Sequence, residues 1–298
     1  MGADRVRSVP GVGVLAPVSP LILVKGAGEM ASAIAWRLYM ANLRRICMLD
    51  LEHPLCVRRQ VSFCVALESG AAEVEGVRAA RARGPAGVEH AWRAGEIPVV
   101  STGDWAGFGG LAAEVVVDAI LAKRNTGTRK ADAPLVIALG PGFEAGTDCH
   151  AVVETNRGHN LGRILLAGSA EPNTGIPGEI AGHAGDRVLR APAAGIFRTT
   201  RAIGDLVGDG DLIGEVAGSA VTAPLSGMLR GLIRPGTSVV RGLKLGDIDP
   251  RGRREYCGAI SDKGRAIAGA VLESIMRHYN VIPSEGKHRV VRRTLAGA

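Results

Sequence analysis

A short apolar run followed by two closely spaced glycines constrains the fold of this chain most. Residues 21–24 are Leu-Ile-Leu-Val, and Gly26 and Gly28 separate them from residues 30–38, where apolar side chains recur at helical spacing. This order predicts a strand, a glycine turn and a helix. In such a unit the first glycine turns the chain, and the second lets a diphosphate approach the N–H groups at the start of the helix.

A second apolar run, residues 46–49, ends in an acid at the position of a ribose-binding carboxylate. Asp50 stands 22 residues beyond Gly28, which is where such a carboxylate is expected in a dinucleotide-binding βαβ unit. A carboxylate there favours a free 2′-hydroxyl, as in NAD, over a 2′-phosphate. The predicted cofactor-binding residues are Gly26, Gly28, Glu29 and Asp50. The alternative is a structural turn that binds nothing.

Further apolar runs predict a sheet with helices on both faces. Residues 97–100, 114–117 and 135–139 are apolar and partly β-branched, and polar or glycine-rich residues follow each run. Aromatic residues make up only 3% of the chain while apolar residues make up 46%, so the core must consist of Ala, Val, Leu and Ile. We expect an α/β fold with a doubly wound, mainly parallel, Rossmann-like sheet.

An internal repeat sets the region from about residue 188 to 248 apart. Its two halves align without a gap at an offset of 32 residues, and four glycines keep register: Gly195, Gly204, Gly210 and Gly214 match Gly227, Gly236, Gly242 and Gly246. Two such halves resemble the barrel-sandwich hybrid of biotinyl and lipoyl domains. Residues 216–220, which join the halves, contain no lysine, so we expect no covalent biotin or lipoyl group.

These patterns divide the chain into five segments. We expect a disordered leader over residues 1–20, the Rossmann-like domain with a polar pocket over 21–187, the small β domain over 188–250, and a basic tail over 280–298. Residues 251–279 are predicted to return to the Rossmann-like domain as an edge strand, residues 257–260, and a helix with Ser261 as its N-cap.

Polar side chains gather after two of the predicted strands, where ligands bind in doubly wound sheets. The residues predicted to bind an anionic substrate or to shape its pocket are Asp118, Lys123, Arg124, Asn125, Asn156, Arg157 and Asn160. A loop over residues 171–179 is expected to close over the same pocket. Arg58 and Arg59 either clamp a phosphate or carboxylate or lie on a solvated helix face.

The same region supplies the candidates for proton transfer, which are Asp148, His150, Glu154 and His159. On an extended segment, Asp148 and His150 would share one face and could form a proton relay. A polar network without catalytic function is the alternative. No HExxH motif, facial triad or paired-cysteine spacing is present, so we expect no metal site.

Charge and cysteine content bear on partners and compartment. The formal net charge is +7, but the C-terminal end carries part of it and aromatic residues are few, so nucleic-acid binding is not expected. No apolar run approaches the roughly 20 residues of a membrane helix. The five scattered cysteines form no disulfide framework, which favours a reducing, cytoplasmic setting.

Four long motifs resemble one family. VVDAILAKRNTGT, APLVIALGPGFEAGTDCHAVVETNRGHNLGR, AEPNTGIPGEI and YCGAISDKGRAIAGAVLE are similar to the YqeB proteins, accessory factors associated with selenium-dependent molybdenum hydroxylases. The resemblance covers about residues 20–276. It implies a cytoplasmic maturation role, a molybdenum hydroxylase client and a Rossmann-like region similar to that of XdhC-type chaperones. It transfers no catalytic residue.

Three functions follow from these observations. The first is an accessory protein whose Rossmann-like site binds NAD or molybdopterin dinucleotide during maturation of a molybdenum hydroxylase. The second is an NAD-dependent oxidoreductase on a small anionic substrate, with His150 or His159 as proton donor. The third is a client-docking module with an inert Rossmann-like region. The sequence leaves homo-oligomerisation open.

Overall fold

The structure is a computed structural model, and it describes residues 19–106, 108, 111–173, 175, 179 and 181–279. Most of the predicted leader and the whole basic tail lie outside these residues. No helix in the described part of the chain is both long enough and apolar enough to cross a membrane.

A nine-stranded sheet forms the centre of the described chain, in the order β10-β9-β7-β6-β1-β2-β5-β4-β3. Seven of its strands run parallel to one another: β1 (Ile22–Lys25), β2 (Ile46–Asp50), β4 (Val77–Arg81), β5 (Ile97–Ser101), β6 (Val115–Asp118), β7 (Leu135–Leu139) and β9 (Ala151–Val153). Apart from β4, their spatial order, β5-β2-β1-β6-β7-β9, is that of doubly wound dinucleotide-binding sheets. The prediction of an α/β fold with a mainly parallel sheet is therefore confirmed.

One antiparallel strand completes each edge of this sheet. At one edge β3 (Ala71–Val74) forms a hairpin with β4, which lies parallel to β5, and at the other edge β10 (Ile164–Leu165) pairs with β9. Two further strands, β8 (Glu144–Ala145) and β11 (Gly168–Ser169), pair with each other in the loops beyond β7.

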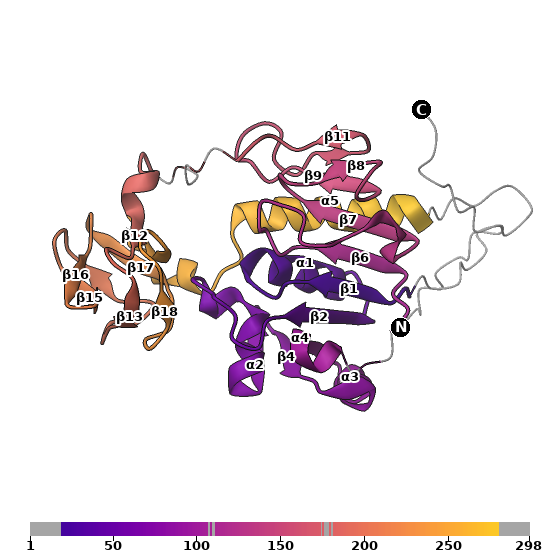
Figure 1. Ribbon diagram of the computed structural model, residues 1–298, viewed down its shortest axis with the longest axis horizontal. Helices are drawn as coiled ribbons and strands as arrows, with labels where there is room; N and C mark the ends of the chain where they lie inside the picture. Colours follow the sequence, from indigo (N-terminus) through magenta and orange to yellow (C-terminus); the bar gives the residue numbers. More distant parts are fainter. Residues whose placement is uncertain are drawn as a thin grey trace, which may run out of the picture.

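Helices cover both faces, so two separate apolar layers form against the sheet (Figure 1). On one face α1 (Glu29–Met40) packs against α5 (Asp262–Tyr279), with Ile34 and Val271 in a shared core. On the other face α3 (Gly84–Arg93) and α4 (Thr102–Trp105) contribute Val88 and Trp105 to a second core. Short helical turns fill the connections: η1 (Arg59–Val61), η2 (Phe63–Val65), α2 (Ala66–Ser69), η3 (Lys130–Asp132) and η4 (Gly185–Arg187).

The strands between residues 188 and 249 form a separate layered structure, which we call the β unit. Its strands are β12 (Val188–Arg190), β13 (Gly195–Arg198), β14 (Leu206–Val207), β15 (Leu212–Val216), β16 (Ser219–Thr222), β17 (Gly227–Leu232), β18 (Ser238–Val239) and β19 (Lys244–Asp249). They form two antiparallel four-stranded sheets, β12-β19-β17-β14 and β16-β15-β13-β18, and each sheet takes two strands from each half of the repeat.

The offset of the sequence repeat is visible in the strands of the β unit. Strands β13 and β17 begin at residues 195 and 227, β14 and β18 at 206 and 238, and β15 and β19 at 212 and 244. Phe197 and Leu229 lie in the core of this unit, separate from the cores of the large sheet. Its assignment to the barrel-sandwich hybrid stays a prediction.

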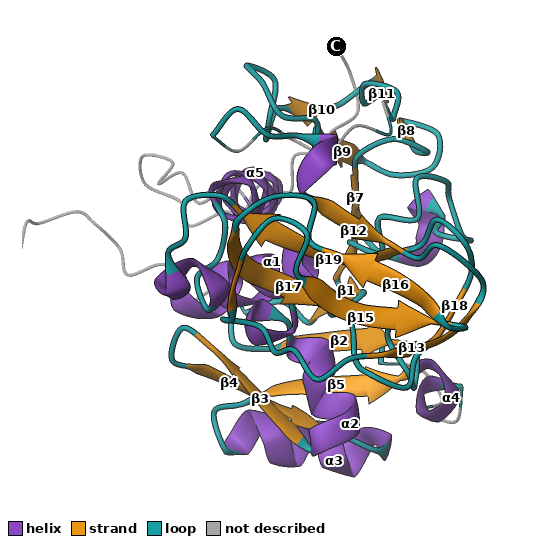
Figure 2. Cartoon of the chain, turned by 90° about the vertical axis from the view of Figure 1, so that its left-hand side faces the viewer, coloured by secondary structure: helices purple, strands orange, loops and turns teal. Residues whose placement is uncertain are grey.

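The β unit lies across the carboxyl ends of the parallel strands (Figures 1 and 2). Val57, in the loop after β2, packs against the core of the β unit, and its carbonyl accepts the N–H of Leu232 at 2.9 Å. Arg59 Nε donates to the Leu232 carbonyl at 2.9 Å. The β unit therefore covers the edge of the sheet at which ligands bind in doubly wound folds.

The return of the chain to the large sheet differs from the prediction in one element. Residues 257–260 form no edge strand; instead the 3-10 helix η5 (Arg254–Cys257) leads through a turn into α5. The carbonyls of Tyr256 and Ala259 accept hydrogen bonds from the buried Arg58 rather than from a neighbouring strand. The predicted N-cap of α5 is confirmed, because Ser261 Oγ accepts the N–H of Gly264 at 3.2 Å.

Candidate functional site

The glycine turn lies at the centre of the sheet, between β1 and α1. Gly26 has φ +95°, and a Cβ there would lie 2.9 Å from the carbonyl oxygen of Ala119, the residue that follows β6. Only glycine fits this contact. Gly28, by contrast, has an ordinary φ of −72°, and nothing lies within 4 Å of the place where its Cβ would be. The helix start beyond Gly28 is thus open on this side.

Asp50 holds the glycine turn in place. Its Oδ2 accepts the N–H of Ala27 at 2.7 Å and its Oδ1 accepts the N–H of Leu51 at 2.8 Å. Burial raises the pKa of Asp50, while the hydrogen bonds from Ala27 and Leu51 oppose the rise. Each carboxylate oxygen can accept a second hydrogen bond, so Asp50 keeps the acceptor capacity that a ribose hydroxyl would use.

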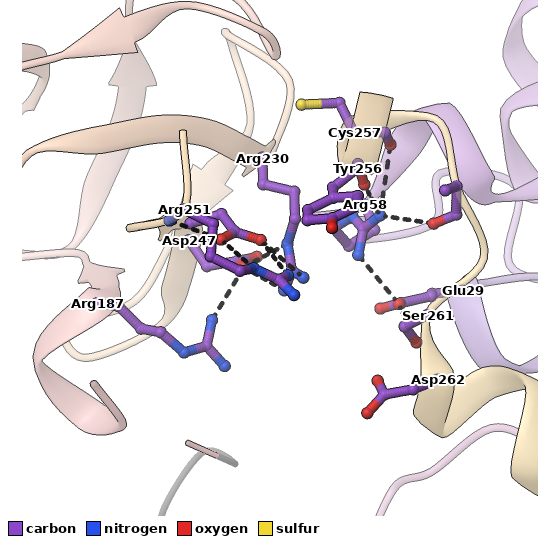
Figure 3. A network of polar contacts seen from close by, with 12 residues as sticks. Glu29, Arg58, Arg187, Arg230, Asp247, Arg251, Tyr256, Cys257, Ser261 and Asp262 are labelled. Carbon is purple, nitrogen blue, oxygen red and sulfur yellow. Dashed lines mark hydrogen bonds and ion pairs between the residues drawn. The ribbon is translucent and has the colours of Figure 1, made fainter. Parts of the chain in front are cut away.

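Glu29, the first residue of α1, is tied to the rest of the protein by a buried arginine (Figure 3). Arg58 is 4% exposed, and its Nη1 lies 3.2 Å from Glu29 Oε1. Its Nη2 donates to the carbonyls of Tyr256 and Ala259 at 2.9 and 3.1 Å. Burial lowers the pKa of Arg58, and Glu29 opposes this effect. Arg58 therefore joins α1, η5 and the start of α5. The alternative of a solvated helix face is wrong, because Arg58 is buried, while a contact with a phosphate or carboxylate stays a prediction.

A cavity of about 380 Å³ lies between the carboxyl ends of β6, β7 and β9 and the β unit; we call it the cationic cavity. Its lining includes Lys123, Glu154, Asn156 and Arg157, which the sequence placed in a polar pocket. Residues that sequence reasoning missed complete it: Arg190 and Lys244 of the β unit, and Lys263 of α5. Arg157 also lines an adjoining cavity of about 280 Å³ beside Arg58.

Glu154 organises one wall of the cationic cavity. The carboxylate is buried and accepts three backbone N–H groups, those of Thr155 and Asn156 on Oε1 and that of Glu171 on Oε2, each at 2.7 Å. These bonds fix Glu171 against the end of β9, and Glu171, Pro172, Asn173 and Gly175 line the cavity; residues 174 and 176–178 of the predicted loop lie outside the described residues, so its closing over the pocket stays a prediction.

The predicted amide side chains act on a carboxylate of the same wall. Nδ2 of Asn156 and Nδ2 of Asn160 donate to the two oxygens of Glu171, at 2.6 and 2.8 Å. These two hydrogen bonds lower the pKa of Glu171. Arg157 is held by both carboxylate oxygens of Asp262, at 2.7 and 3.0 Å. Asn160 therefore does not line the cavity itself but contacts Glu171, which does.

Two predicted pocket residues instead hold the loop after β6. Asp118 is 1% exposed; its Oδ2 accepts the Thr128 hydroxyl at 2.6 Å, and the same hydroxyl accepts a hydrogen bond from Lys25 Nζ at 2.9 Å. Asn125 Oδ1 accepts the N–H groups of Gly127 and Thr128, both at 2.8 Å. These contacts shape the loop that carries Lys123 and Arg124, both of which are exposed.

Asp148 and His150 lie away from the cationic cavity. His150 Nδ1 accepts the N–H of Val136 at 2.9 Å, and Val136 is near the start of β7, at the opposite end of the strand from the cavity. Asp148 Oδ2 accepts the N–H of Glu144 at 2.9 Å within a turn. Burial, followed by the charge of Lys130, lowers the pKa of His150. His159 is exposed, and none of these three residues lines the cavity.

A third cavity, of about 530 Å³, lies on the β2 side of the glycine turn. Its lining includes Cys56, Arg59 and Cys64, together with the β-unit loop at Arg234. The N–H of Cys64 donates to the carbonyl of Ala27 at 2.9 Å, so the wall of this cavity is anchored to the glycine turn. The residues that line the three cavities do not include Gly26, Gly28 or Asp50 themselves.

A buried charge network stabilises the β unit on the side that faces Glu29 and Arg58 (Figure 3). Asp247 is 1% exposed, and its Oδ2 accepts Arg187 Nη1 at 3.0 Å and Arg230 Nη2 at 2.7 Å. Lys244 Nζ lies 3.5 Å from its other oxygen.

Among the described residues, no group of three or more His, Cys, Asp and Glu side chains could hold a metal ion.

The chain is 48% identical over 274 residues to a protein of Escherichia coli (strain K12) named "Uncharacterized protein YqeB". The match covers 91% of this chain but only 50% of that protein, so the chain spans about half the length of this relative. The similarity supports the resemblance to the YqeB family that the long motifs indicate. No protein-family model matches the chain.

Solved structures give weaker similarities. An aspartoacylase family protein from Mesorhizobium loti is 21% identical over 23% of this chain and 24% of its own, with a TM-score of 0.21. The apo Ectoine utilization protein EutE (DoeB) from Ruegeria pomeroyi is 11% identical over 77% of this chain and 86% of its own, with a TM-score of 0.24. Scores of this size do not indicate a shared fold.

Proposed function

We propose that the protein binds a dinucleotide, either NAD or molybdopterin dinucleotide, in the crevice between the parallel sheet and the β unit. The observation that carries the proposal is the open space at Gly28, at the start of α1 and beside the point where the strand order reverses between β1 and β6. Gly28 has no side chain and α1 has no side-chain cap, so the first N–H groups of the helix are available to a diphosphate.

Two cavities, one beside the loop after β2 and one beyond β6, support a ligand with two halves. The cavity on the β2 side lies next to the loop that follows Asp50, where the ribose of the first nucleotide would bind. The cationic cavity lies beyond β6, on the side of the second half. Glu29 would oppose a diphosphate, but its ion pair with Arg58 offsets its charge.

We further propose that the protein serves as an accessory factor in the maturation of a molybdenum hydroxylase. This role rests on the resemblance of the long motifs to the YqeB proteins. The position of the β unit over the carboxyl edge of the sheet supports it, because a labile cofactor held there would be shielded from water. Of the two other functions, the oxidoreductase loses support because neither of its proposed proton donors, His150 and His159, lines any of the three cavities.

The proposal is tested by replacing Gly28 with valine. Calorimetric titrations of the full chain with NAD, NADP, FAD, CTP and extracted molybdenum cofactor are expected to show binding of a dinucleotide. In Gly28→Val the affinity should fall by about 100-fold, because the side chain occupies the space that the diphosphate needs. The fold should be retained, since φ at Gly28 is −72° and nothing lies within 4 Å.

Gly269→Val is the matched control. Gly269 lies in α5, also has open space around its Cβ position, and lines none of the three cavities. It should likewise leave the protein folded, without changing dinucleotide affinity. Equal binding by Gly28→Val and the unchanged protein, or no dinucleotide bound at millimolar concentration, would contradict the proposal. Binding of NAD alone would favour the oxidoreductase over the maturation role.

A further inference from the structure

The cationic cavity contains more positive than negative side chains. Five cationic residues line it, Lys123, Arg157, Arg190, Lys244 and Lys263, against two carboxylates, Glu154 and Glu171. Both carboxylates are engaged with backbone N–H groups or amides. Within the described chain neither carboxylate forms an ion pair. The two carboxylates that line the cavity therefore do not neutralise its five cations.

Three of the cations, Lys123, Arg190 and Lys263, have no carboxylate partner within the described part of the chain; Arg190 Nη1 donates to the Gly242 carbonyl at 3.0 Å. Lys123 lies in the loop after β6, and Lys263 lies in the first turn of α5; neither takes part in an ion pair. Arg157 and Lys244 each have a carboxylate partner, Asp262 and Asp247, but these partners stand outside the lining of the cavity.

Lys263 is placed unfavourably for a cation. The first turn of a helix carries a partial positive charge, which repels an ammonium group. Burial lowers the pKa of Lys263, and Arg157 and Lys123 lower it further, while Glu29 and Glu154 oppose the shift. An anion in the cavity would remove this cost, since it would meet the ammonium group and the helix N-terminus together.

We infer that the cationic cavity is a subsite for a phosphate-class dianion, built jointly by the large sheet and the β unit. Lys123 and Lys263 supply unpaired ammonium groups from the sheet side, and Arg190 supplies a guanidinium from β12. A bound dianion would then hold the β unit against the sheet, because it contacts cations of both.

The cationic cavity also restricts which dinucleotide can bind between the sheet and the β unit. A cationic cavity repels the positively charged nicotinamide ring of oxidised NAD and accepts a second half that carries negative charge. This restriction on the dinucleotide rests on the proposed dinucleotide function. The phosphate subsite itself can be tested without a dinucleotide.

The test titrates the full chain with inorganic phosphate and pyrophosphate at constant ionic strength. Lys263→Gln and Arg190→Gln are each expected to weaken binding by about tenfold or more, since each removes a charged hydrogen-bond donor from the anion. Lys130→Gln is the matched control: Lys130 is exposed, donates to the carbonyl of Gly146 and does not line the cavity. It should leave phosphate affinity unchanged, which separates a built site from general attraction to a basic protein.

Lys263 provides a second readout that a purely structural role would not produce. Its folded pKa lies below the ordinary value of 10.5, so unfolding takes up a proton and stability falls as the pH drops through that range. Lys263→Gln should therefore keep or raise the unfolding temperature of the ligand-free protein at neutral pH. Added phosphate should raise the unfolding temperature of the unchanged protein more than that of the variant.

The outcomes separate this inference from the proposed function. Phosphate affinity that is the same in Lys263→Gln as in the unchanged protein, or no phosphate binding, overturns the subsite. If Gly28→Val abolishes phosphate binding and Lys263→Gln does not, the anion binds at the glycine turn and the subsite is wrong. If Lys263→Gln alone weakens phosphate binding and no dinucleotide binds, the subsite stands without the proposed function. An unchanged affinity in Arg190→Gln overturns the contribution of the β unit.

Discussion

Asp247→Asn is expected to destabilise the protein by about 3–5 kcal/mol, the cost of removing one partner from a buried charge network. Asp247 is 1% exposed and lies within 3.5 Å of Arg187, Arg230 and Lys244. An asparagine of the same shape would leave these cations close together without their shared counter-charge. Chemical unfolding at neutral pH measures the effect.

The pH dependence of this difference provides an internal check. Burial alone would raise the pKa of Asp247, but Lys244 and Arg230 outweigh burial and hold the pKa well below its ordinary value of 3.8. A carboxyl group with a depressed pKa stabilises the fold above the unfolded pKa, and this contribution is lost as the pH falls through the folded pKa. The stability difference between Asp247→Asn and the unchanged protein should therefore shrink below pH 3.8.

Glu215→Gln is the control for this prediction. Glu215 belongs to the same unit, is about half exposed and pairs with Arg198 at 3.8 Å. Loss of such a surface pair should change the free energy of unfolding by no more than about 1 kcal/mol. Equal effects of the two substitutions would show that the buried network does not stabilise the β unit.

Gly142→Ala is expected to cost about 2–5 kcal/mol, from an unfavourable backbone conformation together with overpacking. Gly142 has φ +102°, and a Cβ there would lie 2.5 Å from Cα and 2.6 Å from N of Arg124. Because backbone atoms form this contact, the loop that carries Lys123 must move. We therefore expect weaker phosphate binding in addition to the loss of stability, measured by unfolding and by titration of the same variant.

Gly146→Ala separates the two causes. Gly146 follows four residues later, directly after β8, with a similar φ of +95°, but nothing lies within 4 Å of its Cβ position. This variant should lose only the conformational part, about 1–2 kcal/mol, and keep phosphate affinity. If Gly142→Ala is no more destabilising than Gly146→Ala, close packing of the two loops is not required.

Local patterns predicted the elements of the fold well. Strands β1, β2, β5, β6 and β7 lie within one or two residues of the apolar runs that predicted them, and α1 and α5 follow the helical periodicities. Ser261 caps α5 as expected. These features depend on hydrophobic spacing and on the conformational preferences of glycine and serine, which the sequence carries directly.

The roles of individual polar residues were predicted less well. Arg58 could be assigned to a ligand or to solvent, but its partners are carbonyls of Tyr256 and Ala259, about 200 residues further along the chain. His150 stands close in sequence to Glu154, yet β9 separates them, and they lie at opposite ends of that strand. Spacing along the chain does not reveal such distances, because a strand of only three residues carries its flanking loops to opposite edges of the sheet.

The sequence by itself determined three features: the strand–glycine turn–helix unit, the mainly parallel sheet, and the repeat of the β unit. Each of them follows from the spacing of apolar residues or glycines along the chain. Only the tertiary structure decided that Arg190, Lys244 and Lys263 share a cavity with Lys123. These residues come from β12, β19, α5 and the loop after β6. They meet because the β unit lies on the carboxyl edge of the sheet, and that placement results from packing between distant segments.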